Sequence, residues 1–188
     1  MRLATTDEAN ALLADDPLAL LIGMLLDQQI PMEKAFTSPQ VLAGRMGTGR
    51  LDAHAIAEHD PAAFEEVFRE VPALHRFPAA MAKRVQELCR ALVDRYEGDP
   101  RRIWAEVGTG RELVGRLTAL PGFGEQKAKI FTALLGKQLD VQPDGWREAA
   151  GSYGDPGSFR SVADVVDADS LLKVRTFKKE QKAAAKAG

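Results

Sequence analysis

The stretch LPGFGEQKAKIFTALLG, residues 120–136, places one proline and two glycines directly before a helical pattern. Glycine permits the positive φ values of a tight turn and lets another backbone or a ligand come close. The first N–H groups of the following helix have no partner within the helix, and the helix dipole favours an anion beside them. Residues 120–124 therefore predict a phosphate-binding turn or, alternatively, only a tight corner between two helices.

Asp144 lies twenty residues after Gly124, within the sequence VQPDGW. A carboxylate can stabilise the positive charge that develops on a sugar when an N-glycosidic bond breaks, and it can orient or deprotonate the attacking water. Asp is also a favoured N-cap, so Asp144 could simply cap a short helix over residues 145–151. Both roles stay open at this point, and one side chain can serve both.

Nearly every segment of the chain has a helical pattern. Residues 17–30 are apolar almost all round and predict a buried central helix. Residues 78–99 carry apolar side chains at three- and four-residue steps, as an amphipathic helix does. No stretch shows the alternation of a strand, so we expect an all-α fold.

Composition excludes several classes of protein. With 188 residues, 45% hydrophobic and 28% charged, the chain is expected to be globular. Cys89 is the single cysteine, so the chain cannot form a disulfide framework or supply a cysteine-ligated cluster, and the three histidines lack metal-ligand spacing. Residues 1–16 contain no apolar core of signal-peptide length and no apolar run reaches the length of a membrane span, so we expect a cytoplasmic protein that binds no membrane.

The charges are unevenly distributed. Residues 173–188 carry six Lys and Arg and one Asp or Glu, a net charge of +5, which leaves −7 on residues 1–172. Such a basic tail can attract phosphates without regard to sequence, or it can be only a solvated helix end. Lys127 and Lys129 lie in the first two turns after Gly124, where acids are usual, and a phosphate ligand would explain them.

The hairpin stretch resembles the helix-hairpin-helix element of the endonuclease III (HhH-GPD) superfamily of DNA glycosylases. In that family an L-P-G-hydrophobic-G hairpin is followed by a Gly- and Pro-containing loop and a catalytic Asp, a position that falls here on Asp144. Residues 20–30 resemble the family's early helix, with Gln29 at the position of its DNA-facing glutamine. Residues 77–99 resemble the helix that follows its wedge loop. The resemblance covers roughly residues 17–150.

The resemblance implies a two-lobed helical bundle with a cleft between the lobes. We expect one lobe over about residues 20–135, which contains the hairpin, a second lobe of residues 1–19 plus 136–172, and a basic tail over residues 173–188. The implied function is base excision repair: a monomer, nucleoid-associated if bacterial, binds lesion-containing duplex DNA, flips a damaged or mispaired nucleotide and cleaves its glycosidic bond with Asp144.

The resemblance also implies roles for further residues. We expect DNA contacts at Leu120, Gly122, Phe123, Gly124, Gln126, Lys127, Gln29 and Phe77. Phe77 lies where the family places a side chain that fills the gap left by the flipped base, although it could equally anchor the core. Gln28 and Trp146 are weaker candidates for the base pocket, and Trp146 could equally be a core residue. In the family, backbone carbonyls at the positions of Thr118, Leu120 and Phe123 hold a monovalent cation.

Two departures from the family refine the expected reaction. Members that also cut the strand carry a Schiff-base lysine two residues after the second hairpin glycine, where this chain has Gln126. Lys127 is rotated from that point by about 100° on a helix, and an amide cannot form an imine. The family's four-cysteine iron–sulfur loop is absent from the sequence. We therefore expect a monofunctional glycosylase that needs no cofactor; the alternatives are a non-catalytic DNA-binding protein that retains the hairpin and a helical interaction protein.

Overall fold

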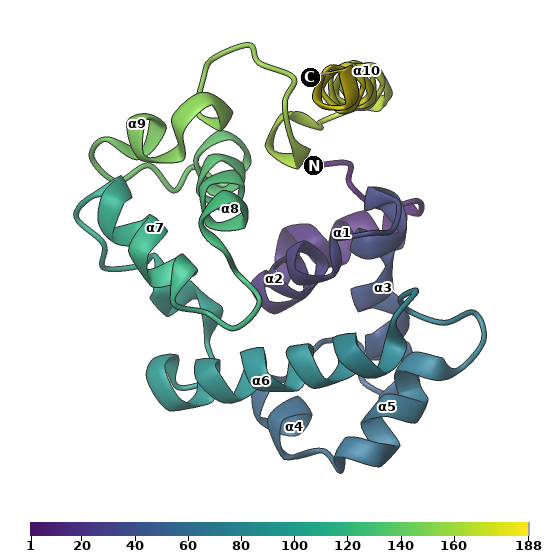
Figure 1. The fold of residues 1–188 in the computed structure, drawn as a ribbon. Coiled ribbons are helices and arrows are strands. Elements are labelled where there is room, and N and C mark those ends of the chain that lie inside the picture. The colour runs from purple at the N-terminus through teal and green to yellow at the C-terminus, as the bar shows by residue number, and fades with distance from the viewer. Residues whose placement is uncertain (188) are drawn as a thin grey trace. The chain divides into compact units, whose positions relative to one another are not determined.

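The computed structural model describes residues 1–187, and Gly188 of the predicted basic tail lies outside the described residues. The described residues form ten α-helices and three short 3₁₀ helices and contain no strand, which confirms the all-α prediction (Figure 1). Contacts between residues divide the chain into two compact units. One consists of Leu3–Glu106 with Ala119–Phe123 and is called the large unit here. The small unit consists of Met1–Arg2, Val107–Thr118 and Gly124–Gly188.

The large unit is built around α2, whose residues 18–26 are all buried. This all-round burial follows from its sequence, which has no charged side chain between the first and last residues of the helix. Helices α1 and α3 contact α2, and α4 and α5 both pack on α6 (Figure 1). The elements are α1 (Asp7–Asp15), α2 (Pro17–Leu26), α3 (Met32–Arg45), α4 (Ala53–Glu58), α5 (Pro61–Arg69), α6 (Pro78–Tyr96) and η1 (Pro100–Ile103).

Side-chain caps set the starts of four of these α-helices. In each of them, the side chain of the N-cap residue accepts a hydrogen bond from a backbone N–H of the first turn. The N-cap residues are Thr6 for α1, Asp16 for α2, Asp52 for α4 and Asp60 for α5. Asp16 also accepts the N–H of Leu51 through its second oxygen at 3.1 Å, so this buried carboxylate joins two segments of the large unit.

The small unit contains α7 (Gly110–Thr118), α8 (Glu125–Gln138), α9 (Trp146–Ala150), η2 (Gly151–Tyr153), η3 (Val162–Asp164) and α10 (Ala168–Ala187). Helices α7, α8 and α9 pack against one another, and α10 contacts η3. The hairpin helices α7 and α8 therefore belong to the same packed group as the loop that follows α8.

These boundaries differ from the lobes that the sequence order favoured, which put residues 1–19 with residues 136–172. Helix α1 buries Ala9 and Leu13 and contacts α2 and α3, so it belongs to the large unit. Helices α7 and α8 group with α9 instead of joining the lobe expected over residues 20–135.

No single helix among the described residues is long and apolar enough to cross a membrane. Helices α1 and α2 reach that length and apolarity only together, and they are bent by 114° at their junction.

A buried ion pair fastens the segment before α10 to the end of α8. Lys137 Nζ lies 2.6 Å from Asp164 Oδ1 and donates to Ser158 Oγ at 3.1 Å and to the Asp155 carbonyl at 2.9 Å. The other carboxylate oxygen of Asp164 accepts the N–H groups of Arg160 and Ser161. Because the Asp164 side chain is only 3% exposed, this pair is weakly screened by solvent.

Replacing Asp164 by Asn is expected to lower the free energy of unfolding by about 3–5 kcal/mol, because it leaves the Lys137 ammonium buried without its counter-charge. Urea denaturation followed by circular dichroism measures the change. Asp169→Asn is the matched control, since its ion pair with Lys173 is exposed and should contribute little. Equal effects of the two variants would contradict a stabilising role for the buried pair.

Candidate active site

The backbone of Asp144 is held against the start of α7. Its N–H donates to the Gly108 carbonyl at 3.2 Å and its carbonyl accepts the N–H of Gly110 at 2.8 Å, which forms an isolated parallel bridge with Thr109. The Asp144 side chain is exposed, and within the described residues nothing forms a hydrogen bond or ion pair with its carboxylate. A fixed backbone thus presents an unpaired carboxylate.

Asp144 does not cap the helix that follows it. The N-cap of α9 is Gly145, with φ of 67°, and no side chain accepts a hydrogen bond from the first turn. The Asp144 carboxylate therefore has no capping function in this structure, although capping was one of the two roles that the sequence left open.

Trp146 fills a slot between α7 and α8 that two glycines leave open. A Cβ atom at Gly136 would lie 2.5 Å from Cε3 and Cζ3 of the Trp146 ring, and a Cβ atom at Gly110 would collide with the Trp146 backbone. Trp146 is 7% exposed, and the Arg147 guanidinium lies 4.3 Å from its ring centroid. The structure thus places Trp146 in the packing of the small unit, where it does not line the pocket beside Asp144.

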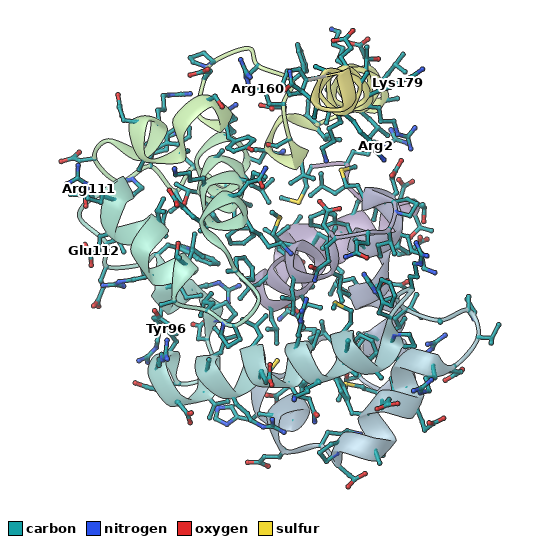
Figure 2. The ribbon with its side chains drawn as sticks, viewed as in Figure 1. Arg2, Tyr96, Arg111, Glu112, Arg160 and Lys179 are labelled. Atoms are coloured by element: carbon teal, nitrogen blue, oxygen red, sulfur yellow. The ribbon has the colours of Figure 1, made fainter. Side chains whose placement is uncertain are left out.

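Asp144 lines an open pocket of about 630 Å³ within the small unit. The volume is in the range of sites that bind small molecules. Arg111, which lines this pocket, extends outward from the start of α7 (Figure 2). The other lining residues are Thr109, Val114, Glu125, Lys129, Gly145, Glu148 and Ala149.

The bases and acids around this pocket are partly paired. Lys129 Nζ lies 2.6 Å from Glu125 Oε1, and this hydrogen bond, together with the charge of the ammonium, holds the pKa of Glu125 below its ordinary value. The pair explains why a base lies in the second turn of α8, a position for which the sequence had suggested a phosphate. Lys127, the other base, is half-buried.

The Gln126 side chain contacts Tyr153 and does not face the pocket of Asp144. Its Nε2 donates to the Tyr153 hydroxyl at 2.9 Å, and Gln126 is not among the residues that line the pocket of Asp144. No pattern in the sequence links Gln126 with Tyr153, because the two residues come from separate elements, α8 and η2.

The two glycines of the hairpin differ in what they do for the fold. Gly122 has φ of 80°, and a Cβ atom there would collide with the Leu25 side chain, so the turn requires glycine. Gly124, the N-cap of α8, has φ of −75° and ψ of 170°, and nothing lies within 4 Å of the position of a Cβ atom. The local packing therefore gives no reason for glycine at position 124.

Leu120 and Phe123 are each only 3% exposed, so their side chains are buried and do not face a partner. The Leu120 carbonyl accepts the N–H of Phe123 at 3.1 Å, which leaves it one lone pair for a cation. The cation site at Thr118, Leu120 and Phe123 stays a prediction. In the described part of the chain, no group of three or more His, Cys, Asp or Glu residues could hold a metal ion.

In the large unit, His75 links the segments of Gln29 and Phe77. The Phe77 N–H donates to His75 Nδ1 at 3.0 Å, so His75 carries its proton on Nε2 and donates it to the Gln28 carbonyl at 3.0 Å. Gln29 is exposed with φ of 59°, and Phe77 is 42% exposed. His75 thus joins the Phe77 backbone to the residue that precedes Gln29.

Gln28 is half-buried, and its side-chain amide contacts residues of the large unit. Its Nε2 donates to the Leu25 carbonyl at 3.2 Å and lies 3.3 Å from Met81 Sδ. Its predicted place in a base pocket stays a prediction.

Gly136→Ala is expected to force Trp146 out of its slot and to lower the free energy of unfolding by about 1–3 kcal/mol. The Trp fluorescence spectrum and urea denaturation report the displacement and its cost. Gly115→Ala in α7 is the control, because nothing lies within 4 Å of its Cβ position and alanine favours a helix. A Gly136→Ala variant as stable as the control would show that the slot tolerates a methyl group.

Comparison with known proteins gives one match. A family model described as HhH-GPD superfamily base excision DNA repair protein matches residues 22–185. No curated protein and no solved structure matches the chain.

Proposed function

Because the chain belongs to the HhH-GPD superfamily of base excision DNA repair proteins, its partner is DNA, and we propose that it is a DNA N-glycosylase that uses Asp144. The observation that carries this proposal is the Asp144 carboxylate itself. It is exposed beside an open pocket, its backbone is fixed by hydrogen bonds to Gly108 and Gly110, and it lies twenty residues after the second hairpin glycine.

The proposed reaction is hydrolysis of the bond between a damaged or mispaired base and its deoxyribose. The bond breaks with its electron pair leaving on the base, and C1′ of the sugar becomes positively charged. The Asp144 carboxylate stabilises this charge, orients a water molecule toward C1′ and accepts a proton from it as the new C–O bond forms. Because the backbone of Asp144 is already held, little reorganisation is needed.

The hydrolytic route, without strand cleavage, is supported by Gln126. An amide nitrogen cannot form the imine on which a lyase step depends, and the Gln126 amide already donates to Tyr153. The proposed reaction consumes only water, so it requires no cofactor.

The proposed DNA contact at the hairpin is supported by Gly124. The free space at this N-cap lets a phosphate oxygen approach the first N–H groups of α8, where the helix dipole favours negative charge. A monovalent cation on the hairpin carbonyls would supply further positive charge there.

Asp144→Asn is expected to abolish base release while DNA binding is retained, because the amide keeps the shape but loses the charge that stabilises C1′. The assay incubates a panel of lesion-bearing and mispaired duplexes with the protein, then reveals abasic sites with hot alkali. We expect the rate on the accepted lesion to fall at least roughly 100-fold.

Samples without alkali serve as the control for the lyase step, and they should show intact strands. Base release at equal rates by wild type and Asp144→Asn would contradict the role of Asp144. If the wild type binds duplexes but releases no base from any of them, the protein is the non-catalytic DNA-binding alternative.

A second prediction compares the two hairpin glycines. Gly122→Ala should lower the free energy of unfolding by about 1–3 kcal/mol, because alanine is strained at positive φ and its methyl group meets Leu25. Gly124→Ala should change stability by less than about 1 kcal/mol but weaken duplex binding several-fold, because its methyl group occupies the space proposed for the phosphate. Unfolding and fluorescence anisotropy measure the two effects. Unchanged DNA affinity in Gly124→Ala would exclude a phosphate at this N-cap.

A further inference from the structure

The basic residues of α10 form a stripe along one side of the helix. The stripe consists of Arg175, Lys178, Lys179 and Lys182. Their three- and four-residue spacing places them within about 100° of the helix circumference. The acidic residues Asp169 and Glu180 of this helix fall outside the stripe.

The opposite side of α10 packs on the small unit. Ser170 and Val174 are buried there, and Phe177 is half-buried with the Arg160 guanidinium 5.1 Å from its ring centroid. Lys179 lies on the side of α10 away from Arg160 (Figure 2). The stripe therefore faces away from the surface that holds the helix.

Three lysines of the stripe form no ion pair in the described part of the fold. Residues 178–185 are all exposed, and Lys178, Lys179 and Lys182 form no ion pair with any residue that the structure describes. Lys173, outside the stripe, is different: it pairs with Asp169 at 2.6 Å and lies 4.7 Å from the ring centroid of Phe159.

The charge of the chain indicates what such a stripe binds. Residues 1–172 carry a net charge of −7, which repels a polyanion such as DNA. The positive charge that can attract a polyanion is concentrated on α10. From Arg175 to Lys182 the helix rises about 10 Å, a length that spans roughly three phosphates of one strand of duplex DNA.

We propose that this stripe is a second DNA-binding surface, which binds the phosphate backbone of duplex DNA without regard to base sequence. The inference rests on the proposed function only in that DNA is the partner. It is independent of Asp144 and of the hairpin, and it assigns the basic tail a task that a merely solvated helix end does not have.

The test replaces Lys178, Lys179 and Lys182 together by Gln in the full chain. Binding to an undamaged fluorescent duplex is measured by anisotropy over a range of salt concentrations. Each lost phosphate contact reduces the slope of log K against log salt by about 0.9, so the slope should become shallower by about 2 to 3, and affinity should fall at least about tenfold at 0.1 M salt.

Two matched variants separate a local contact from a general effect of charge. The three Lys→Arg replacements keep the charge and should keep the slope. Replacing Lys34, Arg50 and Lys83 by Gln removes the same charge from exposed positions of the large unit and should change the slope much less. Circular dichroism should show equal melting temperatures, since residues 178–182 bury nothing.

An unchanged slope in the Lys178/Lys179/Lys182 variant overturns the proposal, as does an equal loss in the Lys34/Arg50/Lys83 variant. Anionic lipid vesicles are the competing probe: loss of vesicle binding with unchanged duplex binding would also overturn it. Because the assay uses undamaged DNA, failure of base release at Asp144 leaves this outcome intact.

Discussion

The fit of Trp146 between Gly110 and Gly136 is the contact on which the geometry around Asp144 depends. Neither α7 nor α8 has a side chain where the indole and its backbone lie, so three elements meet more closely than larger residues would permit. Asp144 is two residues before Trp146, and its own backbone bonds run to Gly108 and Gly110. The same few residues therefore determine the packing of the small unit and the position of the exposed carboxylate.

Three aspartates of this chain show how differently one side chain can be used. Asp16 and Asp164 are buried, and each accepts several backbone N–H groups, so their charge is compensated within the fold. Asp144 is held just as firmly through its backbone but has no such compensation among the described residues. A protein that needs a carboxylate for chemistry must leave its oxygens available in this way, at the expense of a stabilising contact.

Local signals predicted most of the helices and the candidate catalytic residue. The apolar run of α2 depends only on neighbours in sequence, and the position of Asp144 follows from its spacing after the hairpin. The bond between Gln126 and Tyr153, the slot for Trp146 and the burial of His75 depend on residues that meet only after folding. The Glu125–Lys129 pair is a different case, because its four-residue spacing was a readable signal for an ion pair.

The link through His75 has a consequence for how this surface can evolve. His75 holds its two neighbours by main-chain groups, the Gln28 carbonyl and the Phe77 N–H, and its ring also lies 6.1 Å from the Phe77 ring. Any amino acid except proline at position 77 would retain the same N–H and hence the same hydrogen bond to His75. The scaffold can therefore exchange the residue presented at this point, and with it the preference for a partner, without rebuilding the turn that carries it.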